Sequence, residues 1–73
     1  MSQSIVAINA RNQFRGKIKE IIAGPVVSEV DVETPAGIVT SVVTSRSIED
    51  LGLEVGSEVL TVFKSTEVLL AKL

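Results

Sequence analysis

An alternation of mostly apolar and mostly acidic positions over residues 26–33 is the feature that most limits the folds open to this chain. Val26, Ser28, Val30 and Val32 fall on one side of the alternation, and the other side is mostly carboxylate. A period of two places successive side chains on opposite faces of a strand, so one face is buried and the other is solvated.

A turn-forming run at residues 34–37, Thr-Pro-Ala-Gly, follows this strand. The next segment, residues 38–44, has β-branched side chains at nearly every position. The two segments predict a β-hairpin whose second strand is covered on both faces.

Three other segments carry strand patterns. Residues 13–23 alternate up to a break at Glu20 and Ile21, which predicts either a bulge or a strong twist before Gly24 and Pro25 end the strand. Residues 58–64 and 68–73 are predicted as the last two strands, and residues 1–8 as a short β-segment or an arm. The predicted core face of the 13–23 strand carries Phe14, Gly16, Ile18 and Ile22.

A short helix is predicted between the hairpin and residues 58–64. Ser47 followed by Asp50 resembles a capping box, Ile48 and Leu51 form an apolar pair, and Gly52 can end the helix. The expected fold class is all-β, a small five-stranded barrel of the oligonucleotide/oligosaccharide-binding (OB) type with one short helix.

The chain is short for an independently stable domain. Its 73 residues contain no cysteine and no histidine, so a disulfide is excluded and a stabilising zinc or haem site is not expected. With 45% hydrophobic residues and a mean hydropathy of +0.43, we expect a single domain that is stabilised by association with other copies. No apolar run approaches the roughly 20 residues of a membrane span, and no signal peptide is visible, so a cytoplasmic protein without membrane partners is expected.

Residue types also exclude function classes. Without histidine or cysteine, the commonest general base and the best nucleophile are absent, and a non-enzyme is expected. Glu29, Asp31 and Glu33 are interpreted as a solvated strand face rather than a metal site. A net charge of −2 and only two aromatic residues disfavour nucleic acid as a partner, although Arg15, Lys17 and Lys19 leave a nucleic-acid-binding OB module as the alternative.

Hydrogen-bond donors gather at three places where strands begin or end. These are Arg11, the segment Thr44-Ser45-Arg46-Ser47, and the segment Lys64-Ser65-Thr66. Arginine offers a planar fork of donors and lysine a point charge, and both suit an anion that has several acceptor oxygens. These donors suit an oxyanion site, and the alternative interpretation is that Ser47 is only an N-cap and that Arg11 and Lys64 are only exposed surface cations.

The same three segments resemble the molbindin family, the molybdenum-pterin-binding (Mop) proteins with a TOBE-like domain. The similarity rests on Asn9-Ala10-Arg11-Asn12-Gln13, on Thr44 to Ser47 before Ile48-Glu49-Asp50-Leu51-Gly52-Leu53, and on residues 62–68. Position 9 departs from the serine that is usual in the family, although the Asn9 amide can also donate.

The resemblance implies a single Mop domain over residues 1–73 that binds molybdate or tungstate between subunits, for molybdenum storage or homeostasis. It implies a homohexamer, assembled as a trimer of dimers, with Asn9, Ala10 and Arg11 contributed by one chain and Thr44, Ser47, Lys64 and Ser65 by another. A second oxyanion site is also implied, for which the turn at Gly24, Pro25 and Val26 is a candidate. The same module could instead be a regulatory domain that docks on a molybdate transporter or repressor.

Overall fold

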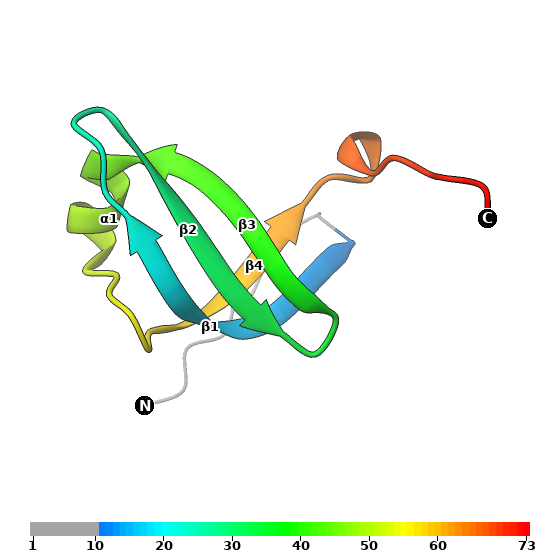
Figure 1. Cartoon of the computed structure of the whole chain (residues 1–73), viewed down its shortest axis with the longest axis horizontal. Coiled ribbons are helices and arrows are strands. Elements are labelled where there is room, and N and C mark those ends of the chain that lie inside the picture. The colour runs from blue at the N-terminus through cyan, green and yellow to red at the C-terminus, as the bar shows by residue number, and fades with distance from the viewer. Residues whose placement is uncertain (1–10) are drawn as a thin grey trace.

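A computed structural model of the chain describes residues 11–73 and shows an antiparallel sheet that curls around a small core (Figure 1). The strand order is β3-β2-β1-β4, so β3 and β4 are the two edges. Helix α1 lies at one end of the sheet, and the turn η1 lies at the other end, followed by an extended C-terminal segment. The elements are β1 (Asn12–Ile22), β2 (Val27–Thr34), β3 (Gly37–Thr44), α1 (Ser45–Leu51), β4 (Glu58–Phe63) and the 3₁₀ turn η1 (Ser65–Glu67).

A bulge in β1 changes which side chains face the core. Ile18 pairs with Val32 and Glu20 pairs with Asp31, so Lys19 is the extra residue on the bulged strand. Of the two predicted alternatives, a bulge or a strong twist, the bulge is observed, but the predicted inward facing of Ile22 is wrong. One inserted residue reverses the alternation beyond it, which turns Ile21 toward the core and leaves Ile22 exposed.

The core of one chain is small. Ile18, Val30 and Val32 are its buried apolar residues within the described part of the chain, and Ile48 and Leu53 pack against them. The prediction that residues 38–44 are covered on both faces is wrong for the isolated chain, because β3 is an edge strand and has no buried residue. Val26 is also exposed, because it precedes the first residue of β2.

Gly16 lies where β1 and β2 approach each other most closely. A Cβ atom there would lie 2.3 Å from the Glu33 carbonyl oxygen and 2.9 Å from the Thr34 Cγ2 and Val32 Cγ1 atoms. Gly16→Ala must therefore displace backbone, and we expect it to lower the free energy of unfolding by about 1–3 kcal/mol, as other overpacked sites do.

Urea denaturation would measure the effect of Gly16→Ala. Lys17→Ala is the matched control, because Lys17 is the exposed neighbour in the same strand. Equal stability of the two variants would show that the strands can separate at Gly16 without cost.

Helix α1 begins three residues earlier than the sequence predicts. The N-cap is Thr44, whose Oγ1 accepts the Ser47 N–H at 3.2 Å, so the prediction of Ser47 as the N-cap is wrong. The hydroxyl that accepts this N–H belongs to the residue at the end of β3, where the backbone is still extended. The helix ends as predicted, with Gly52 in the left-handed conformation at φ 62°.

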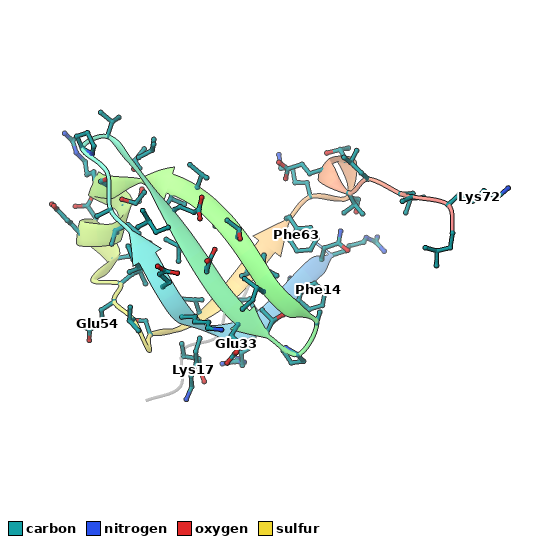
Figure 2. The ribbon with its side chains drawn as sticks, in the orientation of Figure 1. Phe14, Lys17, Glu33, Glu54, Phe63 and Lys72 are labelled. Atoms are coloured by element: carbon teal, nitrogen blue, oxygen red, sulfur yellow. The ribbon has the colours of Figure 1, made fainter. Side chains whose placement is uncertain are left out.

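The predicted strand at residues 68–73 does not form in the single chain. After η1 the segment runs away from the sheet, and Lys72 projects beyond the rest of the molecule (Figure 2). A strand needs a neighbouring strand to pair with, and this segment has none within its own described chain. The structure thus has four strands rather than five, and the predicted segment at residues 1–8 lies outside the described residues.

None of the helices in residues 11–73 has the length and apolar character needed to span a membrane.

Candidate functional site

Arg11, Lys64 and Ser65 lie at one end of the β1–β4 ladder. The last residue pair of this antiparallel ladder is Asn12 with Phe63, so Arg11 and Lys64 are each one position beyond it. All three residues are exposed. We call them the cationic cluster, because the strand register brings two positive charges and a hydroxyl to one place.

Two aromatic rings support this end of the sheet. Phe14 and Phe63 have ring centroids 5.9 Å apart at an interplanar angle of 38°, and they lie beside each other near η1 (Figure 2). The Thr61 hydroxyl also donates to the Phe14 carbonyl oxygen at 2.9 Å, which adds a side-chain bond to the strand pairing. These contacts fix the strand ends from which Arg11 and Lys64 extend.

Glu67 is a neighbour of the cationic cluster that the sequence analysis did not single out. Its Oε1 accepts the Lys64 N–H at 3.1 Å, and its own N–H donates to the Lys64 carbonyl oxygen at 2.9 Å. These two bonds close the η1 turn around Ser65. A carboxylate three residues after the residue that precedes the turn, here Lys64, is the capping-box pattern that could have indicated this role.

Thr44 and Ser47 form a second cluster, at the junction of β3 and α1. Their hydroxyl oxygens are 2.7 Å apart, and the Thr44 oxygen also accepts the Ser47 N–H. Thr44 is exposed and Ser47 is half-buried. We call this pair the hydroxyl cluster, and its hydroxyl groups are available as donors to an anion once they turn away from each other.

The two clusters lie at opposite ends of the curled sheet, because α1 and η1 do (Figure 1). The sequence predicts that Thr44, Ser47, Lys64 and Ser65 come from one chain and Arg11 from another. Within one chain the register instead groups Arg11 with Lys64 and Ser65, far from the hydroxyl cluster. Asn9 and Ala10, the remaining predicted site residues, lie outside the described residues.

The turn at Gly24, Pro25 and Val26 has little capacity left for an anion. The Gly24 N–H donates to the Ser28 hydroxyl at 3.4 Å, the Gly24 carbonyl accepts from Ser45, and Pro25 has no N–H. Of the backbone N–H groups that could hold a second oxyanion there, that of Gly24 is therefore occupied, and Pro25 has none.

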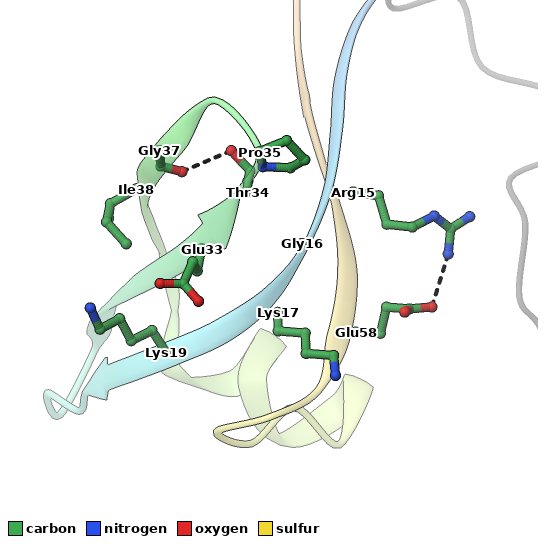
Figure 3. A pocket seen from close by; sticks show the side chains of 10 residues that line it. All are labelled: Arg15, Gly16, Lys17, Lys19, Glu33, Thr34, Pro35, Gly37, Ile38 and Glu58. Atoms are coloured by element: carbon green, nitrogen blue, oxygen red, sulfur yellow. Dashed lines mark hydrogen bonds and ion pairs between the residues drawn. The ribbon is translucent and has the colours of Figure 1, made fainter.

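The basic side chains of β1 are interleaved with carboxylates. Arg15, Lys17 and Lys19 line an open hollow together with Glu33 and Glu58 (Figure 3). Arg15 Nη1 is 2.9 Å from Glu58 Oε1, and Lys17 is paired in register with both Glu33 and Glu58. This face has no uninterrupted positive charge for a phosphate backbone, so the structure does not favour the nucleic-acid alternative.

Metal-binding side chains do not gather in the part of the chain that the structure describes. Residues 11–73 contain no group of three or more His, Cys, Asp or Glu side chains placed to hold a metal ion. The donors of the two clusters are suited to an anion, not to a cation.

Comparisons with known proteins match nearly the whole chain. The TOBE domain family model matches residues 8–70. Molybdenum-pterin-binding protein 3 of Clostridium pasteurianum is 44% identical over 66 residues, which cover 89% of this chain and 97% of that protein.

Two solved structures share the fold. A molybdate binding protein from Sporomusa ovata has a TM-score of 0.86 at 28% identity, with 92% of this chain and all of that chain covered. The cytoplasmic molybdate-binding protein ModG, solved with molybdate bound, has a TM-score of 0.77 at 35% identity, and the match covers 81% of this chain and 43% of that one.

Proposed function

This chain belongs to the TOBE domain family, among the molybdenum-pterin-binding proteins, and from that premise we propose that it binds molybdate or tungstate between subunits for storage and homeostasis of molybdenum. The observation that carries the proposal is the separation of two donor clusters to opposite ends of one chain. In this proposal neither cluster alone surrounds the anion, and together they offer hydrogen-bond donors and positive charge without a carboxylate.

The chemistry of the anion matches these donors. Molybdate is a tetrahedral dianion at neutral pH, so its oxygens only accept hydrogen bonds. Arg11 and Lys64 can neutralise its two charges, while Thr44, Ser47 and Ser65 can donate from their hydroxyls. Asn9 and Ala10 are proposed to complete the shell beside Arg11. No step of this binding needs a base or a nucleophile, so we propose a binding protein rather than an enzyme.

The arrangement of the clusters requires two chains for each site. In this proposal the cationic cluster of one subunit meets the hydroxyl cluster of another. Lys64 and Ser65 therefore come from the same chain as Arg11, and not from the chain that supplies Thr44 and Ser47, as the sequence predicted. Because the anion then bridges subunits, binding and assembly stabilise each other. A homohexamer built as a trimer of dimers provides such contacts, and the ligand-bound ModG structure shares the fold of this chain.

Exposed apolar surface supports the proposed assembly. Leu69, Leu70 and Leu73 have relative exposures of 92%, 95% and 115%. An apolar groove runs between the two edge strands, lined by residues 39–43 of β3 and 59–63 of β4, with Ile18, Val30 and Val32 below. Surfaces of this kind are rarely left in contact with water.

We propose that residues 68–73 of one subunit fill the apolar groove of another. The leucine side chains of the segment can cover the apolar lining of the groove, and the backbone of the segment can pair with the unpaired edge of β3. The five-stranded barrel expected from the sequence would then close between two chains instead of within one. The whole chain is proposed as a single Mop domain in the cytoplasm, the compartment named for ModG.

Isothermal titration calorimetry with molybdate, tungstate and sulfate tests the function. We expect saturable binding of molybdate and tungstate by the assembled protein, and weaker binding of the smaller sulfate. Native mass spectrometry with and without molybdate would count subunits and anions in one measurement. A folded oligomer that binds neither molybdate nor tungstate would contradict the proposal.

A further inference from the structure

We propose that Ser28 and Ser45 are positioning residues of the oxyanion site, which hold Thr44 and Ser47 in place through a closed ring of hydrogen bonds. The inference rests on the proposed function, because it adds residues behind the hydroxyl cluster. Neither serine belongs to the predicted ligand set, and Ser28 lies on the core face of β2 among valines.

The ring has one consistent direction. The Ser45 hydroxyl donates to the Gly24 carbonyl oxygen at 2.6 Å, so its single proton is used there. The short contact of 2.7 Å between the Ser28 and Ser45 oxygens must then have Ser28 as its donor. The Ser28 oxygen in turn accepts the Gly24 N–H at 3.4 Å. Gly24, Ser28 and Ser45 therefore satisfy one another in a cycle.

Burial makes the cycle difficult to break. Ser28 is only 3% exposed. Leaving a buried hydroxyl without a partner costs more free energy than a typical hydrogen bond contributes to stability. All buried side-chain oxygens and nitrogens of the described residues have partners, and Ser28 obtains its partners from this cycle. Gly24 is also confined, since a Cβ atom there would lie 2.3 Å from the Val27 carbonyl oxygen.

Helix α1 depends on these bonds because its packing is slight. None of its residues is buried, and Ile48 is the one partly buried apolar residue of the helix that packs against the core cluster. At the start of the helix, Ser45 is held twice, by its hydroxyl on Gly24 and by its N–H, which donates to the Val26 carbonyl oxygen at 2.8 Å. The turn between β1 and β2 is thus the anchor for the first turn of α1.

The anchor fixes the hydroxyl cluster because Ser45 lies between its two members in the chain. Thr44 precedes Ser45 directly, and Ser47 is tied back to Thr44 through its N–H and its hydroxyl. A shift of Ser45 away from Gly24 would move both donors together. The expected consequence is a weaker site that keeps all of its ligands.

Molybdate titration of Ser45→Ala and Ser28→Ala by calorimetry tests the proposal, with the unfolding midpoint of each ligand-free variant measured alongside. We expect the Kd for molybdate to rise about three- to tenfold in each variant, the range of one lost hydrogen bond. Ser45→Thr keeps the hydroxyl on the same atom and should restore the Kd. In the ligand-free protein, amide hydrogen exchange at Ser47 should become faster in Ser45→Ala.

Thr34→Val is the matched control, since the Thr34 hydroxyl is also buried and donates to the Gly37 carbonyl oxygen at 2.8 Å, outside the apolar groove and both clusters. An unchanged Kd in both alanine variants, with normal binding by the unaltered protein, would overturn the positioning role and leave the proposed function intact. A rise in Kd of the same size in Thr34→Val would also overturn it, because the effect would then be general destabilisation. Absence of binding by the unaltered protein would reject the proposed function and this inference together.

Discussion

Lys64→Ala and Arg11→Ala are each expected to raise the Kd for molybdate by about ten- to a hundredfold, the cost of one charge-assisted hydrogen bond. Both residues are exposed at the free ends of β1 and β4, so their removal leaves the core untouched. Calorimetry would measure the Kd, and the unfolding midpoint without ligand should stay within the range of ordinary surface substitutions.

A control that removes the same charge elsewhere distinguishes a specific contact with the anion from the effect of the protein's overall charge. Lys19→Ala removes one positive charge at the β1 bulge, away from the cationic cluster, and should leave the Kd nearly unchanged. Lys64→Arg should bind molybdate less tightly than the unaltered protein, because a planar fork does not reproduce a compact ammonium group. Equal affinities of Lys64→Ala, Arg11→Ala and Lys19→Ala would show that the anion binds elsewhere.

Removal of residues 68–73 is expected to dissociate the oligomer. Leu69, Leu70 and Leu73 are almost fully exposed in the single chain, and burying a leucine side chain stabilises a complex by about 1.5–3 kcal/mol. Loss of three such contacts per subunit should shift the protein to smaller species at micromolar concentration. Sedimentation equilibrium would measure this shift, and molybdate binding should be lost with it.

Two substitutions refine this test. Leu70→Asp places a charge in the proposed contact and should have nearly the effect of the deletion, because an unpaired carboxylate is unfavourable in an apolar groove. Lys72→Gln alters a polar residue of the same segment and should leave the mass of the oligomer unchanged. A truncated protein that kept its native mass would show that other surfaces hold the subunits together.

Local sequence patterns predicted most of the sheet. The alternation at residues 26–33, the turn before Gly37 and the stop at Gly52 all gave elements within two residues of those observed, because these signals act within a few residues. The start of α1 was mislocated for a local reason as well. Both Thr44 and Ser47 can cap a helix, and only the extended backbone at Thr44 decides between them.

Local patterns could not predict which side chains of β1 face the core or whether β3 is covered on both faces. The position of the bulged residue, Lys19, depends on pairing with β2, and it decides that Ile21 rather than Ile22 faces the core. The coverage of β3 depends on the sheet order, which leaves this strand at an edge. In both cases the outcome depends on strand pairing with residues that are distant in the sequence, such as Ile18 with Val32 and Asn12 with Phe63.

The sequence by itself determined that the chain is a small β protein whose donors suit an oxyanion and whose apolar content exceeds what one copy buries, since composition and periodicity set both properties. Only the tertiary structure decided how the donors are divided. Pairing of Asn12 with Phe63 brings Arg11 beside Lys64, and the curl of the sheet carries Thr44 and Ser47 to the opposite end. The physical reason is that strand register and sheet order join residues about fifty positions apart, and no local pattern encodes that distance.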